Sequence, residues 1–178
     1  MLRLFRSENP AKASARRLYE RLVERARAPV FYRAFRVADT IDGRFDLLAL
    51  HAFLVMEAVR DKGPAGAALG EALATTIFTG FEEALRDLGV GDLGLSRRIK
   101  AMADAFYGRL EAYESAAATQ EALAAAILRN IYRGESGYTG EAAGLAKYMM
   151  DARVRLATQD AKAALLSGGL DYGPLPNP

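Results

Sequence analysis

Residues 39–64 read DTIDGRFDLLALHAFLVMEAVRDKGP, a polar start followed by a long apolar run and a Gly-Pro stop. Asp42 is a residue type that favours the N-cap position of a helix, and Gly63-Pro64 does not continue one. The stretch therefore predicts a helix from Gly43 to about Lys62, with Asp42 as its cap. His51 stands in the middle of that apolar run, which favours a partly buried histidine hydrogen-bonded to a neighbouring helix over a ligand or base.

Upstream, an earlier helix is predicted from Ala11 to Ala28. Proline disfavours the helical conformation of the residue before it, so this helix should stop before Pro29. Its apolar residues recur at the three- and four-residue spacing of one buried stripe. An aromatic patch follows, made of Phe31, Tyr32 and Phe35, and core positions are favoured over exposed anchors for these three side chains.

Downstream, turn residues separate four further predicted helices. Gly89 suits the C-terminal end of the first of them, and Thr119 suits the N-cap of the third. The four predicted ranges are Ala65–Leu88, Ser96–Ser115, Thr119–Tyr132 and Thr139 to Gly168-Gly169. The tail from Leu170 to Pro178 is rich in proline and is expected to be extended.

The sequence thus predicts an all-α, single-domain helical bundle of about six helices with short connections. Alternation with period two and internal repeats are both absent from it. We expect residues 1–15 to form a basic N-terminal lead-in, residues 16–168 the helical domain, and residues 169–178 an extended tail. No segment has the roughly 18 consecutive apolar residues of a membrane span, and no secretory h-region is present.

The residue inventory argues against an enzyme. The chain has no cysteine and one histidine, so thiolate and zinc chemistry lack their ligands and a catalytic triad lacks support. No phosphate-binding loop or dinucleotide fingerprint occurs, since Gly89-x-Gly91-x-x-Gly94 follows a predicted helix instead of a strand. We expect no cofactor, no metal and no catalytic residue.

Charge is unevenly distributed along the chain. Residues 1–44 hold eleven Lys and Arg against five Asp and Glu, although the whole chain carries only +2. Arg17, Arg21 and Arg25 recur every four residues and form one ridge on the first helix. Two interpretations stay open: nearby glutamates neutralise this ridge, or it attracts an anionic partner such as an acidic protein, RNA or the phospholipid leaflet.

Three charges, Arg44, Asp46 and Arg86, stand within apolar segments. If buried they must be paired, and a structural ion-pair network is slightly favoured over a binding role. The residues most suited to contact a client or partner protein are the arginines, aromatics and embedded charges of the region from Arg17 to Arg44 and the residues that follow. This candidate set comprises Arg17, Arg21, Arg25, Phe31, Tyr32, Arg44, Phe45 and Asp46.

Five sequence segments carry a family resemblance. They are Ala26-Arg-Ala-Pro-Val-Phe-Tyr32, Asp39-Thr-Ile-Asp-Gly-Arg-Phe-Asp-Leu-Leu-Ala-Leu-His51, Leu85-Arg-Asp-Leu-Gly-Val-Gly-Asp92, Tyr107-Gly-Arg-Leu-Glu-Ala-Tyr113 and Arg129-Asn-Ile-Tyr132. In this order and spacing they resemble the ubiquinol–cytochrome c chaperone family, the assembly factors of the cytochrome bc1 complex. Each segment alone is weak, and five in order are specific.

The resemblance implies an all-helical, non-enzymatic chaperone that binds newly made cytochrome b. It further implies peripheral contact with the membrane surface, and in mitochondria a small assembly partner near the ribosomal exit tunnel. The chain begins almost directly at the shared domain, which favours a bacterial protein at the cytoplasmic face of the plasma membrane. It also leaves ribosome attachment and the small partner open, and the segment after Tyr132 matches no family motif.

Two other classes of function compete with the chaperone. A helical carrier of a lipid or quinone is suggested by the Met- and Ala-rich last helix around Met149 and Met150, and would need a sizeable enclosed apolar cavity. Nucleic-acid binding is suggested by the basic first helix and would be steeply salt-dependent. The modest net charge counts against it, and DNA is not an expected partner.

Overall fold

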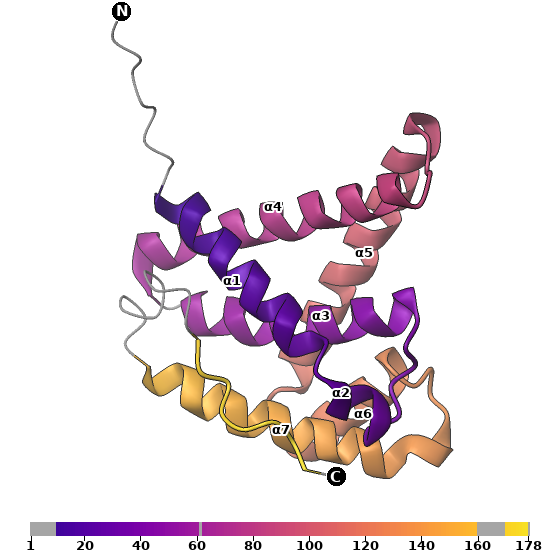
Figure 1. Cartoon of the computed structure of the whole chain (residues 1–178). Coiled ribbons are helices and arrows are strands. Elements are labelled where there is room, and N and C mark those ends of the chain that lie inside the picture. Colours follow the sequence, from indigo (N-terminus) through magenta and orange to yellow (C-terminus); the bar gives the residue numbers. More distant parts are fainter. Residues whose placement is uncertain (1–9, 61, 160–169, 178) are drawn as a thin grey trace, which may run out of the picture.

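The computed structural model describes residues 10–60, 62–159 and 170–177, which form helices joined by short turns (Figure 1). In chain order the elements are α1 (Pro10–Ala26), α2 (Pro29–Arg33), α3 (Ile41–Arg60), α4 (Gly63–Asp87), α5 (Asp92–Ala116), α6 (Gln120–Asn130), the 3₁₀ turn Ser136–Tyr138 and α7 (Thr139–Thr158). No strand occurs in these ranges. The all-α prediction is confirmed, because six long helices form the bundle and α2 adds a single turn of five residues.

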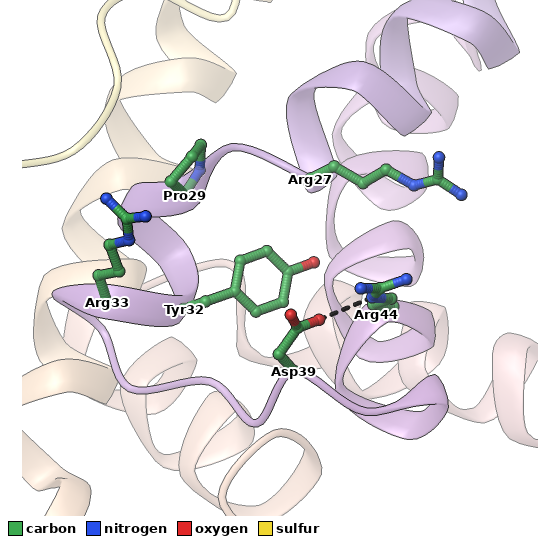
Figure 2. Close-up of a pocket in the computed structure, with 6 residues that line it drawn as sticks. All are labelled: Arg27, Pro29, Tyr32, Arg33, Asp39 and Arg44. Carbon is green, nitrogen blue, oxygen red and sulfur yellow. Dashed lines mark hydrogen bonds and ion pairs between the residues drawn. The ribbon is translucent and has the colours of Figure 1, made fainter.

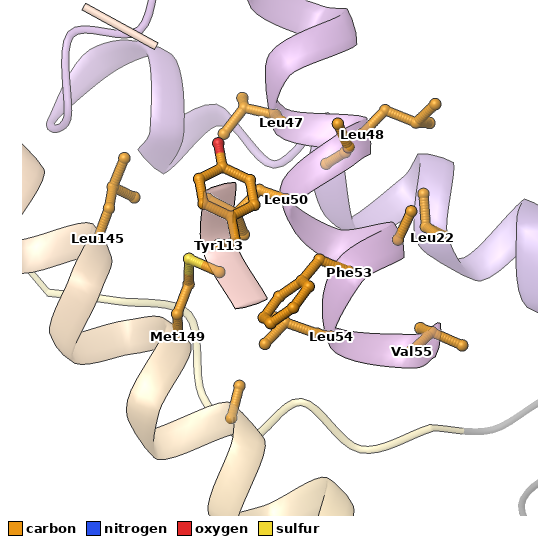
Figure 3. Packing of buried hydrophobic residues seen from close by; sticks show 14 of the residues in the cluster. Leu22, Leu47, Leu48, Leu50, Phe53, Leu54, Val55, Tyr113, Leu145 and Met149 are labelled. Atoms are coloured by element: carbon orange, nitrogen blue, oxygen red, sulfur yellow. The ribbon is translucent and has the colours of Figure 1, made fainter. Parts of the chain in front are cut away.

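Helix α3 is the centre of the bundle and contacts α1, α4, α5 and α7. Every residue from Asp46 to Val55 is buried, as expected for a helix that is apolar around its whole circumference. Figure 3 shows its side chains packed with Tyr113 of α5 and Met149 of α7, and the Phe53 and Tyr113 rings meet edge to face at 5.8 Å. The apolar run of α3 is therefore the core of the fold.

The other helices pack around α3 in pairs. Helix α1 crosses α3 and α4, α6 packs along α7, and α4 and α5 form a hairpin (Figure 1). The crossing of α1 over α4 depends on Gly80, where an added Cβ would lie 2.1 Å from the Tyr19 hydroxyl. The described tail, residues 170–177, has no helix and runs beside α7 (Figure 1).

Two predicted helix ends are confirmed, one by a hydrogen bond and one by its backbone conformation. The Thr119 hydroxyl accepts a bond from the Ala122 amide at 3.2 Å and caps α6. Gly89 has φ +79° and follows the C-terminal end of α4, where glycine has no Cβ penalty. These signals are local, which is why the sequence was sufficient to find them.

The predicted cap of α3 is wrong. Helix α3 begins at Ile41, and the Thr40 hydroxyl accepts a hydrogen bond from the Gly43 amide at 3.2 Å. Asp42 therefore lies inside the first turn, where the negative charge of a carboxylate interacts favourably with the helix dipole and stabilises the helix. An added Cβ on Gly43 would lie 1.9 Å from the Ala38 carbonyl oxygen, so the chain before α3 packs tightly onto this turn.

Three more predicted boundaries shift. Helix α5 starts at Asp92 instead of Ser96, because extended Gly91 serves as its N-cap. Helix α6 ends at Asn130 instead of Tyr132, since Arg133 and Gly134 take φ +56° and +82°. Likewise α1 ends at Ala26, and the aromatic patch contains the short helix α2. The predicted end of the last helix at Gly168-Gly169 lies outside the described residues.

None of the helices in the described ranges combines the length and the hydropathy needed to cross a bilayer.

Candidate functional site

A groove of about 670 Å³ opens between the start of α3, the end of α4, the middle of α5 and the end of α6. We call it the α3–α6 groove. Its large apolar members are Ile41, Phe45, Leu85, Leu88 and Met102. Its charged members are Asp42, Arg98, Arg109, Arg129 and Arg133. A lining that combines large apolar side chains with four arginines can hold an apolar protein segment and attract acidic residues beside it.

Two large apolar side chains of the groove are strongly exposed. Ile41 is 64% exposed and Leu88 is 61% exposed, although both are large aliphatic residues. Between them, Phe45 is half-buried and packs on Phe81 at 5.4 Å between ring centroids. Ile41, Phe45 and Leu88 thus give the groove apolar surface that a bound molecule would cover.

Asp46 holds two of the groove arginines in place from below. Its side chain is fully buried, and Oδ1 accepts from Arg109 Nε at 2.7 Å. Oδ2 lies 2.9 Å from Arg133 Nη2 in an ion pair. Burial raises the pKa of Asp46, and the charges of Arg109 and Arg133 oppose this rise. The predicted pairing of a buried Asp46 is confirmed, and removing one partner of such a pair costs about 3–5 kcal/mol.

The groove carries a surplus of positive charge. Arg98 and Arg129 are exposed, and within the described residues their side chains make no ion pair or hydrogen bond. Arg109 and Arg133 share the single carboxylate of Asp46, so that trio is itself positive. Asp42 is the one acid in the groove lining. An occupant with acidic groups is therefore favoured electrostatically.

A second, smaller hollow of about 390 Å³ lies between the end of α1, α2 and the start of α3. We call it the α2 pocket (Figure 2). Its lining consists of Arg27, Pro29, Tyr32, Arg33, Asp39 and Arg44. Arg44 Nε donates to Asp39 Oδ1 at 2.7 Å, and the Tyr32 hydroxyl donates to the Ala26 carbonyl at 2.9 Å. Burial raises the pKa of Tyr32, partly offset by Arg44.

Three successive residues of α3 thus point to three different places. Arg44 lines the α2 pocket, Phe45 lines the α3–α6 groove, and Asp46 is buried beneath that groove. A helix turns by about 100° per residue, so neighbours in sequence do not share a face. The predicted site residues Arg44, Phe45 and Asp46 are consecutive in sequence but do not form one site in the structure. Arg44 and Arg86 are exposed, although both stand within apolar segments of the sequence.

The predicted arginine ridge of α1 is not one continuous surface. Arg21 pairs with Glu24 at 3.1 Å on the outside, as the neutralising interpretation expects. Arg25 turns inward and donates to Tyr148 Oη at 3.0 Å. It also donates to the carbonyl oxygens of Gly173 and Pro174, and thereby holds the described tail against α1. Arg17 stays near the outside, with a hydrogen bond to Ser14.

Phe31 and His51 belong to the core. Phe31 is fully buried, and its ring lies 5.3 Å from that of His51. His51 is fully buried too; Nδ1 donates to the Leu47 carbonyl at 2.8 Å, and Nε2 accepts from Tyr148 Oη at 3.0 Å. The predicted hydrogen bond to a neighbouring helix is confirmed, with greater burial than expected. Burial lowers the pKa of His51 to about 4, so it is neutral at physiological pH.

Several groove residues are absent from the predicted set, although the sequence held a signal for them. Four of the five family-like segments meet at the α3–α6 groove. They contribute Ile41, Asp42 and Phe45, then Leu85 and Leu88, then Arg109, and finally Arg129 and Asn130. These segments lie far apart in the chain, so their convergence on one surface required the tertiary structure. Arg98, Met102 and Arg133 lie outside them and had no such signal.

The hollows described for this chain do not resemble the enclosed apolar cavity that a lipid or quinone carrier would need. Four of them, all lined by described residues, open at the surface. Met149, one of the two methionines behind the carrier hypothesis, is fully buried in the packed core. These observations disfavour the carrier.

Comparisons with known proteins give consistent matches. The family model described as ubiquinol-cytochrome C chaperone matches residues 33–172. Ubiquinol-cytochrome-c reductase complex assembly factor 1 of Xenopus laevis is 24% identical over 165 residues, which cover 92% of this chain and 82% of that protein. The Mus musculus protein of the same description is 22% identical over 92% of this chain and 56% of its own length. The crystal structure of the Cbp3 homolog from Brucella abortus matches with a TM-score of 0.80 and 37% identity, over 93% of this chain and 91% of that one.

Proposed function

Because the chain belongs to the ubiquinol–cytochrome c chaperone family, we propose that it is a non-enzymatic assembly chaperone of the ubiquinol–cytochrome c reductase (bc1) complex. Its client in this proposal is newly made cytochrome b. The observation that carries the proposal is the family match over residues 33–172, a range that contains every residue of the α3–α6 groove. Relatives described as assembly factors of the same complex support it.

The α3–α6 groove is the surface on which we place the client. A membrane protein that awaits its partners exposes apolar segments, and covering them with Phe45 and Leu88 would remove apolar area from water. The arginines of the rim would attract acidic residues beside such a segment. A chaperone must also release its client, and an open groove allows this better than an enclosed cavity does.

The predicted site residues enter this proposal with different roles. Phe45 lies in the groove, whereas Arg17, Arg21, Tyr32 and Arg44 lie outside its lining and are not part of the client site in this proposal. Phe31, Asp46 and Arg25 would act indirectly, by supporting the helices and arginines around them. We further propose that the protein works at the cytoplasmic face of the plasma membrane, where cytochrome b is inserted.

The test is co-purification of cytochrome b with the tagged protein from gently solubilised membranes of its native host. Leu88→Gln removes an exposed aliphatic side chain from the groove, and Val154→Gln removes one that is 66% exposed on α7. A fully covered Leu side chain contributes about 1.5–3 kcal/mol, so Leu88→Gln should weaken the recovery of cytochrome b by about tenfold or more. Val154→Gln should leave it unchanged. No recovery with the wild type, together with normal bc1 assembly in a deletion strain, would reject the proposed function.

A further inference from the structure

The α2 pocket brings together arginines whose hydrogen-bonding capacity is unused. Within the described residues, the side chains of Arg27 and Arg33 make no ion pair or hydrogen bond. Arg44 uses only Nε on Asp39, which leaves both of its terminal amino groups available. Figure 2 shows the guanidinium groups of Arg27 and Arg44 on the same side of Tyr32, with Arg33 on the other side.

The charge of this pocket is positive and has little internal compensation. Three arginines line it, and Asp39 is its one acid. Guanidinium groups bind phosphate through paired hydrogen bonds, and two of them can hold one phosphate from two sides. A volume of about 390 Å³ has room for a phosphate and the groups attached to it.

An exposed apolar side chain three residues before Arg44 on α3 distinguishes between possible phosphate compounds. Ile41, 64% exposed, lies between Asp39 and Arg44 in sequence, at the point where the chain enters α3. Soluble phosphates and nucleic acids offer nothing apolar for this side chain to enter. A bilayer surface offers both a layer of phosphate groups and an acyl layer beneath it.

We propose that the α2 pocket binds the phosphate group of an anionic phospholipid and is the point at which this protein contacts the membrane. Arg27 and Arg44 bind the phosphate, Arg33 adds attraction to the surface, and Ile41 enters the acyl boundary. The inference deepens the proposed membrane contact. It places that contact on the α2 pocket and on Ile41 of the groove lining, and leaves the rest of the α3–α6 groove for the client.

The first test is co-sedimentation with vesicles of phosphatidylcholine alone or mixed with phosphatidylglycerol. The protein should bind only the anionic vesicles. Arg27→Glu/Arg44→Glu should weaken that binding by at least about tenfold, since each basic residue near such a surface contributes about 1 kcal/mol. The matched control is Arg97→Glu/Lys100→Glu on α5, with the same change in net charge at two exposed residues. It should bind as the wild type does.

Equal loss in both double variants would overturn the site, because net charge alone would then explain the binding. Binding of inorganic phosphate that the Arg27→Glu/Arg44→Glu variant abolishes, without any binding of vesicles, would overturn the lipid assignment in favour of a soluble phosphate compound. The chain has no tryptophan, so Ile41→Trp introduces a single fluorophore of that kind. Its emission should shift to shorter wavelength on anionic vesicles, and an unchanged emission would overturn the insertion of residue 41.

The vesicle experiments are done without cytochrome b. A negative result in them would therefore reject the membrane contact without rejecting the proposed function. In detergent extracts, Arg27→Glu/Arg44→Glu should still recover cytochrome b, while Leu88→Gln should still bind anionic vesicles. Loss of both activities in either variant would contradict the proposal that the groove binds the client and the α2 pocket binds the membrane.

Discussion

At the scale of single residues, the core contains two fully buried polar side chains, and each is paired in a different way. His51 is fully buried, and its two ring nitrogens are used by the Leu47 carbonyl and by Tyr148 Oη. Asp46 is equally buried, but it keeps its charge paired with Arg109 and Arg133. One polar group is thus accommodated as a neutral ring and the other as an ion-pair network.

The histidine predicts a pH dependence of stability. Its pKa is lowered from 6.5 in the unfolded chain to about 4 in the folded one, so the unfolded state binds more protons between these values. The free energy of unfolding should therefore fall as the pH falls from 6.5 toward 4, by about 3 kcal/mol in total from this group. Urea unfolding measured at several pH values checks this, with the interval above pH 5 least affected by carboxyl groups.

His51→Gln is the matched variant for that measurement. It is the one histidine of the chain, so its replacement should flatten the slope between pH 5 and 6.5 even if stability falls at every pH. An unchanged slope would mean that His51 is protonated in the folded protein, contrary to its burial.

At the scale of elements, the bundle depends on a few places where helices approach closely. Gly144 of α7 lies against the ring of Phe35, and an added Cβ would lie 2.6 Å from the Phe35 Cε1 atom. Phe35 is itself buried and follows α2, so this contact ties the segment between α1 and α3 to α7. The tail makes a second connection of this kind, through Arg25 and Tyr148. These contacts fix the chain segment that carries the α2 pocket.

Gly144→Ala should therefore destabilise the protein. Its Cβ cannot be accommodated without moving a buried ring, and overpacking of this kind costs about 1–3 kcal/mol. Gly140→Ala is the control in the same helix, because an added Cβ there meets no heavy atom within 4 Å. That variant should be neutral or stabilised by up to about 1 kcal/mol, since alanine favours the helix. Thermal unfolding of the two variants beside the wild type gives the comparison, and equal stabilities would contradict the close packing.

At the scale of the whole molecule, two separate hollows have different proposed partners. The α3–α6 groove collects residues from four helices, whereas the α2 pocket is built from residues 27–44 alone. Both are positive, but only the groove combines its charge with exposed Leu88 and half-buried Phe45 in its lining. In this proposal, client and membrane are therefore bound by different side chains.

Charge in the groove should control client binding. Arg98→Glu/Arg129→Glu reverses the two groove arginines without an internal partner, which should lower the recovery of cytochrome b by about tenfold or more. Arg97→Glu/Lys100→Glu changes the net charge equally but lies outside the groove lining. It should retain the client. Wild-type recovery with both double variants would remove the arginine rim from the client site.

What the sequence determined by itself was local. The Thr119 cap, the Gly89 turn and the apolar run of α3 predicted where helices lie, because each depends on residues a few positions apart. The family-like segments also indicated the family, since their order and spacing are properties of the chain alone. Even locally there was a limit, because Thr40 and Asp42 are both residue types that cap helices, and only the folded structure shows Thr40 in that role.

Only the tertiary structure decided which side chains work together. Arg25 turns to the tail and Arg109 turns to Asp46, across separations of 148 and 63 residues. Periodicity gives the face of a helix on which a residue lies, but not the distant element that packs against that face. The groove was unpredictable for the same reason, since four segments form it only after α3, α4, α5 and α6 have packed.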